Sequence, residues 1–133
     1  MIKEKKILVT GGNGFIGKEV VDNLIKKRGV LQNNIFIPFQ KDYDLRRWAD
    51  CQKAVKGQDI VIHLAAVTGN IEFHKLNPGK IFYDNLIMGT YLMEAARLAG
   101  VEKFLGIGSA TEYPKNAPIP LKEKDLWLGY PEE

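Results

Sequence analysis

The sequence predicts an α/β protein with a doubly wound parallel sheet between two layers of helices, a three-layer αβα arrangement. Two observations support this fold class. Short apolar runs rich in β-branched residues alternate along the 133-residue chain with amphipathic stretches of helical period. A glycine-rich loop joins the first apolar run to the first amphipathic stretch, and parallel sheets of the Rossmann type begin in this way. The length is that of one domain.

The first strand is predicted over Lys6–Thr10, a short apolar run that is long enough for a strand buried on both faces. A helix is expected from Phe15, because apolar residues then recur at helical spacing as far as Ile25. The basic residues after it and Gly29 are a typical helix end.

Three glycines at three-residue intervals, Gly11, Gly14 and Gly17, stand between this strand and this helix. In a dinucleotide-binding loop, one glycine makes the tight turn, one lets the backbone approach a pyrophosphate, and one lets the helix pack on the strand. The free N–H groups and the dipole of the helix N-terminus favour a bound phosphate. No Gly-Lys-Ser/Thr follows at the required spacing, which excludes a P-loop.

The later elements continue the alternation of strand and helix. Strands are expected at residues 35–37, 59–66 and 103–108, and helices at 48–55 and 78–99, the latter with a proline at its start and Gly100 past its end. Ligands bind such sheets at the carboxyl ends of the strands. The predicted cleft therefore lies where these strands end: Thr10-Gly11, residues 38–40, residues 65–67 and Gly108-Ser109.

The composition is that of an ordinary soluble globular domain, with 45% hydrophobic and 26% charged residues and a net charge of +3. The lysines are scattered among acids, so we expect no nucleic-acid partner, and no stretch is long enough to span a membrane. A single cysteine, Cys51, excludes an internal disulfide and fits a reducing compartment, so the expected location is cytoplasmic. His74 has no second metal ligand at useful spacing, and no metal site is expected.

Four motifs occur in order along the chain: the glycine loop, Asp44-Leu45, His63-Leu64-Ala65-Ala66, and the run Gly108–Pro114. Together they resemble the extended short-chain dehydrogenase/reductases, the NAD-dependent epimerase/dehydratase family that acts on nucleotide sugars. The runs 41–45 and 108–115 are most similar to the GDP-L-fucose synthase branch of that family.

The resemblance implies the positions of a nicotinamide dinucleotide. The glycines and the backbone of the first helical turn would hold the pyrophosphate, Asp44 and Leu45 would lie by the adenine, and residues 64–66 would line the nicotinamide-side ribose. Asn85 would help to fix the geometry of the site, and His63 is expected to be a core histidine. The implied cofactor-binding residues are Thr10, Gly11, Gly14, Phe15, Ile16, Gly17, Lys41, Asp44, Leu45, Leu64, Ala65, Ala66 and Gly108.

The resemblance also implies that Ser109 is catalytic, with its hydroxyl bonded to the reacting sugar hydroxyl or ketone. The family's proton-transferring Tyr-x-x-x-Lys motif does not occur in these residues, and its tyrosine normally falls just past their end. We therefore expect residues 1–133 to be the NAD(P)-binding domain of a longer homodimeric enzyme and to be inactive alone. Its C-terminal part would supply that motif and the substrate domain. The alternative is a non-catalytic module that senses NAD(P) or recruits a partner.

Two further features bear on the reaction and the cofactor. Fucose synthases have a cysteine acid/base two residues after the serine, whereas Thr111 stands there in this chain, which favours a simple 4-epimerase or 4-ketoreductase. No acidic residue ends the second predicted strand, and Lys41 matches a basic position that binds the 2′-phosphate in fucose synthases. NADP is therefore favoured over NAD.

Overall fold

The computed structural model of the chain describes residues 1–131 and contains one parallel sheet of four strands in the order β2-β1-β3-β4. The strands are β1 (Ile7–Thr10), β2 (Ile35–Phe36), β3 (Ile60–His63) and β4 (Lys103–Gly106). The chain passes from β1 to β2 on one side and then returns to β3 on the other. The topological switch point therefore lies between β1 and β3, where open α/β sheets bind their ligands.

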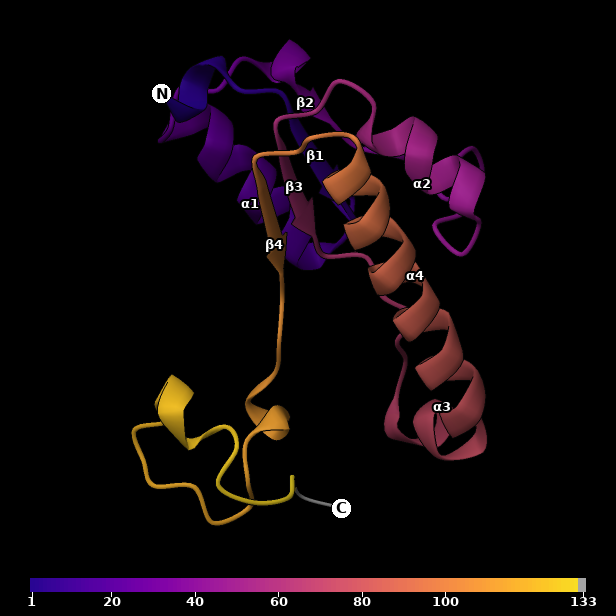
Figure 1. Ribbon diagram of the computed structural model, residues 1–133, viewed down its shortest axis with the longest axis vertical. Coiled ribbons are helices and arrows are strands. Elements are labelled where there is room, and N and C mark those ends of the chain that lie inside the picture. Colours follow the sequence, from indigo (N-terminus) through magenta and orange to yellow (C-terminus); the bar gives the residue numbers. More distant parts are fainter. Residues whose placement is uncertain (132–133) are drawn as a thin grey trace.

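Helices cover both faces of the sheet (Figure 1). Helix α1 (Phe15–Lys26) packs on one face, and α2 (Trp48–Val55) and α4 (Pro78–Leu98) pack on the other. A short helix, α3 (Ile71–Leu76), lies beside the first turns of α4, and the sequence did not predict it. The doubly wound αβα prediction is confirmed.

The two faces of β1 belong to two separate hydrophobic clusters. Ile7 and Val9 pack with Leu24 of α1, whereas Leu8 packs with residues of α2 and α4 such as Leu92. The three β1 side chains are completely buried, which confirms the predicted two-sided burial of this strand. Trp48 of α2 and Tyr91 of α4 meet edge to face, with ring centroids 5.7 Å apart.

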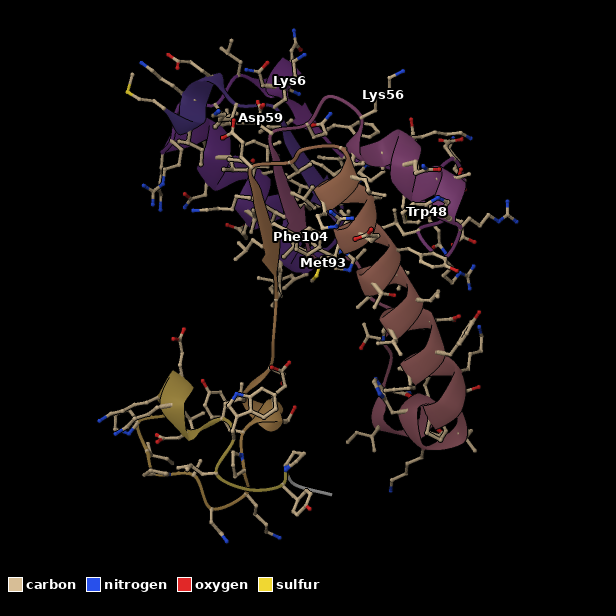
Figure 2. The ribbon with its side chains drawn as sticks, in the orientation of Figure 1. Lys6, Trp48, Lys56, Asp59, Met93 and Phe104 are labelled. Carbon is tan, nitrogen blue, oxygen red and sulfur yellow. The ribbon has the colours of Figure 1, made fainter. Side chains whose placement is uncertain are left out.

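Polar contacts close the end of the sheet at which the strands begin. The backbone N–H of Lys6 donates to Asp59 Oδ2 at 2.7 Å, so the start of β1 is tied to the start of β3 (Figure 2). These contacts leave the carboxyl ends of the strands as the open end of the sheet.

The later strands are shorter than predicted. Strand β3 ends at His63, because β1, its partner, ends at Thr10, so residues 64–66 follow the strand as irregular chain. Strand β4 ends at Gly106 instead of the predicted Gly108, and Leu105 within it is 48% exposed. The reason is that β4 has a neighbour on one side only, and α1 lies over β1 rather than over β4.

Beyond β4 the chain runs away from the sheet into an irregular segment with two 3-10 turns, Ala110–Glu112 and Glu123–Asp125 (Figure 1). An isolated antiparallel bridge between Pro114 and Pro131 closes this segment on itself. Trp127 at its surface is 87% exposed. Among residues 1–131, no helix has the length and apolar character needed to cross a membrane.

Candidate functional site

A cleft of about 600 Å³ opens at the carboxyl ends of the strands, at the switch point. Its walls are the glycine loop, the chain after β2 and the chain after β3, as predicted from the sequence. The lining residues are Thr10, Gly11, Gly12, Asn13, Gly14, Phe15, Ile16, Gly17, Pro38, Phe39, Gln40, Tyr43, Asp44, Leu45, Leu64, Ala65, Ala66, Val67, Thr68, Met88 and Ile107.

Two glycines of the loop are required by the fold itself. Gly11 has a φ of +67°, and a Cβ there would lie 2.9 Å from the backbone nitrogen of Ala65. A Cβ on Gly17 would lie 2.1 Å from the carbonyl oxygen of Gly11, inside van der Waals contact. Gly11 therefore makes the turn, and Gly17 lets α1 pack against the loop.

Gly14 is different, because its backbone needs no glycine. Its φ of −75° and ψ of 180° are extended, and a Cβ would meet only the carbonyl oxygen of Gly11, at 3.2 Å. Gly14 is exposed and is the N-cap residue of α1. A small residue at this point keeps the cleft open at the N-terminus of the helix, where the first-turn N–H groups have no acceptor within the helix and can bind an anion.

Thr10 and His63 form a polar pair at the base of the cleft. Thr10 Oγ1 lies 2.7 Å from His63 Nδ1 and accepts from the backbone N–H groups of Leu64 and Ala65, each at 3.2 Å. Because two donors already point at this oxygen, the Thr10 hydroxyl donates to His63, and His63 carries its proton on Nε2. Burial lowers the pKa of His63 and keeps the ring neutral. His63 is thus a core histidine that fixes the start of the 64–66 wall.

This pairing predicts an acid-sensitive stability. Since the folded pKa of His63 lies below its unfolded value near 6.5, the unfolded chain binds more protons at low pH. The stability contributed by neutral His63 is present above about pH 6.5 and is lost as the pH falls through that value towards the folded pKa. Denaturant unfolding at about pH 7.5 and about pH 5.5 should show a smaller loss on acidification for His63→Gln than for the wild type. An equal loss in both would contradict the lowering of the His63 pKa by burial.

Asn85 of α4 holds the next residue of the same wall. Its Oδ1 accepts from the backbone N–H of Val67 at 2.7 Å, and its Nδ2 donates to the Val67 carbonyl oxygen at 3.0 Å. Both backbone groups of Val67 are therefore satisfied by one amide. Asn85 thus ties α4 to the chain after β3 at a residue of the cleft wall.

Truncating this amide should loosen the cleft wall. We expect Asn85→Ala to cost about 2 kcal/mol of stability, because two part-buried backbone groups lose their partner. Dinucleotide affinity should fall as well, since Val67 lines the cleft. Chemical unfolding and calorimetric titration measure the two effects, with the exposed Asn116→Ala as control. A variant with wild-type stability would contradict the role of Asn85.

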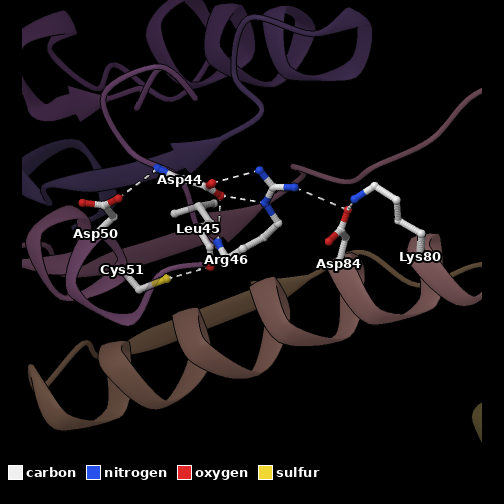
Figure 3. Close-up of polar contacts among 7 residues, drawn as sticks. All are labelled: Asp44, Leu45, Arg46, Asp50, Cys51, Lys80 and Asp84. Carbon is white, nitrogen blue, oxygen red and sulfur yellow. Dashed lines mark hydrogen bonds and ion pairs between the residues drawn. The ribbon is translucent and has the colours of Figure 1, made fainter.

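Asp44 and Leu45 also line the cleft, and Figure 3 shows the polar contacts around them. Arg46 binds both carboxylate oxygens of Asp44 and holds the pKa of that carboxyl below its usual range. Cys51 is buried and donates its thiol to the Leu45 carbonyl oxygen at 3.1 Å. Burial raises the pKa of Cys51 to about 11, so this thiol is an anchor for the wall rather than a nucleophile.

Three predicted site residues lie outside the cleft lining: Lys41, Gly108 and Ser109. Lys41 is exposed, with its Nζ 4.0 Å from Asp42. Ser109 follows β4 and caps the 3-10 turn Ala110–Glu112. Its Oγ lies 2.8 Å from Thr111 Oγ1, and its N–H donates to Glu112 at 2.9 Å. Its side chain is exposed, and its Oγ caps the turn by accepting from the backbone N–H of Thr111 at 3.3 Å.

The sequence did not identify several lining residues, among them Tyr43, Met88 and Ile107. Ile107 was assigned to the fourth predicted strand, which already ends at Gly106, whereas Met88 depends on how α4 crosses the sheet. Within the described part of the chain, no cluster of three or more His, Cys, Asp and Glu side chains is placed to hold a metal ion.

A parallel sheet whose first strand leads through a glycine loop into a helix, with a cleft at the switch point, defines a nucleotide-binding protein of the Rossmann type. The chain belongs to the NAD dependent epimerase/dehydratase family, which it matches over residues 7–131.

Known relatives resemble this chain in sequence, at moderate identity, and in fold. The chain is 32% identical to GDP-mannose 3,5-epimerase 1 of Oryza sativa subsp. japonica, with 96% of this chain and 38% of the relative covered. It is 30% identical to a GDP-L-fucose synthase of Sinorhizobium fredii, covering 97% of this chain and 40% of the relative. The solved structure of MlghC, a GDP-mannoheptose C4 reductase from Campylobacter jejuni with NADP bound, superimposes with a TM-score of 0.83. Its sequence is 29% identical, with 96% of this chain and 40% of that chain covered. The chain thus spans about two fifths of the length of these relatives.

Proposed function

We propose that this chain is the NAD(P)-binding part of a nucleotide-sugar epimerase or reductase that transfers hydride at a sugar carbon. The observation that carries the proposal is the cleft, in which the N-terminus of α1 faces the backbone of residues 64–66 across a loop kept open by Gly14. Residues 1–133 would form one dinucleotide-binding domain. The Tyr-x-x-x-Lys motif and the substrate domain would lie in sequence beyond it.

The residues of the cleft fit a nicotinamide dinucleotide in size and chemistry. The amide groups of Phe15, Ile16 and Gly17 would bind the pyrophosphate, and Thr10, through its bonds to the chain after β3, would keep the wall for the nicotinamide half rigid. The bound cofactor would accept or donate the hydride. Gly108, which has no side chain, would let the backbone approach the cofactor closely. The hydroxyl of the neighbouring Ser109 would hydrogen-bond the sugar oxygen that gains or loses a proton.

NADP is the proposed cofactor, for a reason of charge. The chain after β2 enters the cleft as Pro38, Phe39 and Gln40, without a carboxylate to repel a 2′-phosphate. If the flexible Lys41 side chain reaches that phosphate, Lys41→Ala should weaken NADP binding about tenfold and leave NAD binding unchanged. Calorimetric titration at fixed salt measures both constants, and Lys27→Ala, a lysine past the far end of α1, is the control. Equal effects on NADP and NAD would exclude this role for Lys41.

The substrate is proposed to be a nucleotide sugar, and the assembly a homodimer in the cytoplasm. The GDP-sugar enzymes among the relatives support the substrate class, and a buried free thiol fits a reducing compartment.

The experiment that tests the function uses the product of the complete open reading frame. We expect it to oxidise NADPH in the presence of a GDP-4-keto sugar, or to epimerise GDP-mannose with bound cofactor, and we expect Ser109→Ala to lose most of the rate while still binding NADP. Tight NADP binding without turnover of any GDP- or UDP-sugar would contradict the enzyme and favour the cofactor-sensing alternative.

A further inference from the structure

Asp44 presents a difficulty for a cleft that binds a polyanion. Its side chain lines the cleft and is 22% exposed. It lies beside Phe39 and Gln40, which follow β2, and the adenosine half of a dinucleotide lies over the end of this strand in folds of this type. An unpaired carboxylate there would repel the pyrophosphate and, more strongly, a 2′-phosphate on the ribose.

Arg46 removes this difficulty by binding Asp44 as a fork. Arg46 Nε donates to Asp44 Oδ1 and Nη2 donates to Oδ2, both at 2.9 Å, and the backbone N–H of Arg46 donates to Oδ1 at 3.1 Å. Such bidentate pairs are the strongest ion pairs that a protein surface offers.

Arg46 is in turn held from α4 (Figure 3). Asp84 is buried, with a side chain 5% exposed, and its Oδ2 accepts from Arg46 Nη1 at 3.5 Å and from Lys80 Nζ at 2.6 Å. The four residues Asp44, Arg46, Asp84 and Lys80 therefore alternate in charge and sum to zero. All three guanidinium nitrogens of Arg46 donate to carboxylates of the protein, so the fork is not directed at a ligand.

We propose that Arg46 is a specificity-determining residue: by neutralising Asp44 in the cleft wall, it allows the site to accept the additional phosphate of NADP. Asp84 and Lys80 are positioning residues that act through Arg46. The inference rests on the proposed dinucleotide site and adds the residue that sets its preference between NADP and NAD.

A series of charge variants tests it. Arg46→Met leaves Asp44 unpaired and should lower the ratio of NADP to NAD affinity about tenfold, because the more negative ligand is repelled more. Asp44→Asn leaves the Arg46 charge without its partner and should raise the ratio. The double variant has neither charge and should return the ratio to near the wild-type value. All shifts should shrink in about 1 M salt.

Arg47→Met is the matched control. Arg47 is the next residue and carries the same charge, but it acts on Asp44 only through its charge, which lowers the pKa of Asp44 less than the bonded Arg46 does. Its loss should change the ratio much less than the loss of Arg46.

Two outcomes overturn the inference alone. One is an equal loss of NADP and NAD affinity in Arg46→Met, and the other is a double variant that keeps the full loss of the single variant, which would mean that Arg46 contacts the phosphate directly. If Arg46→Met fails to fold, the Asp44→Asn arm decides, because a lowered ratio in that variant contradicts the proposal. A wild-type chain that binds neither dinucleotide overturns the proposed function as well.

Discussion

Gly14→Val is expected to abolish dinucleotide binding and leave the chain folded. A valine can adopt the extended backbone of Gly14, and its Cβ would meet only the carbonyl oxygen of Gly11, at 3.2 Å. The remaining volume open to it is the cleft at the N-terminus of α1, where the pyrophosphate would lie. We expect at least a ~100-fold loss of NADP affinity, equivalent to about 2.7 kcal/mol. The loss of unfolding free energy should be only about 1 kcal/mol, the usual cost of a poor N-cap residue.

Isothermal calorimetry and thermal unfolding measure these two quantities on the same sample. Gly79→Ala is the matched control, because Gly79 lies in the first turn of α4 and a Cβ there meets nothing within 4 Å. A Gly14→Val chain that binds NADP like the wild type would show that no phosphate approaches this glycine.

Gly17→Ala, unlike Gly14→Val, should cause a large loss of stability. Its Cβ would lie 2.1 Å from the carbonyl oxygen of Gly11 and 2.6 Å from the Cα of Gly12, so the loop backbone itself must move. We expect a loss of about 3 kcal/mol and a fall of roughly 10 °C in Tm, with dinucleotide binding lost because the loop is displaced.

Gly89→Ala is the control for that measurement. Gly89 also lies within a helix, and a Cβ there has free space, so the change should be neutral or stabilising. A Gly17→Ala chain as stable as the wild type would contradict the close packing of α1 against the loop.

The elements bounded by local signals were predicted well from the sequence. Helix α2 spans Trp48–Val55 as predicted, and α1 begins at Phe15 and ends at Lys26, before the basic residues and Gly29. Strand ends were predicted less well, because a strand stops where its neighbour stops: β3 ends with β1, a fact that the apolar run through Ala66 does not contain. Helix α3 was missed because it is only six residues long and closely follows Gly69. Its N-cap is a local signal, since Asn70 Oδ1 accepts from the backbone N–H of Phe73 at 2.8 Å.

The cleft residues also divide into those that local sequence predicts and those that only the packing of distant elements brings together. The glycine loop and the small residues after β3 carry their function in local sequence, and both line the cleft as expected. The charge network does not: Arg46 and Asp84 are 38 positions apart, and only the packing of α4 against the sheet brings them together. The anchoring of Arg46 by Asp84 was therefore outside what the sequence could predict.

The central claim is that backbone amides at the start of α1 bind the pyrophosphate of a nicotinamide dinucleotide. Calorimetric titration of the chain with NADP, NAD and ADP-ribose at one salt concentration tests it most directly. The account predicts one-to-one binding of all three, with NADP the tightest. A folded chain that releases no heat with any of them at about millimolar concentration would contradict it.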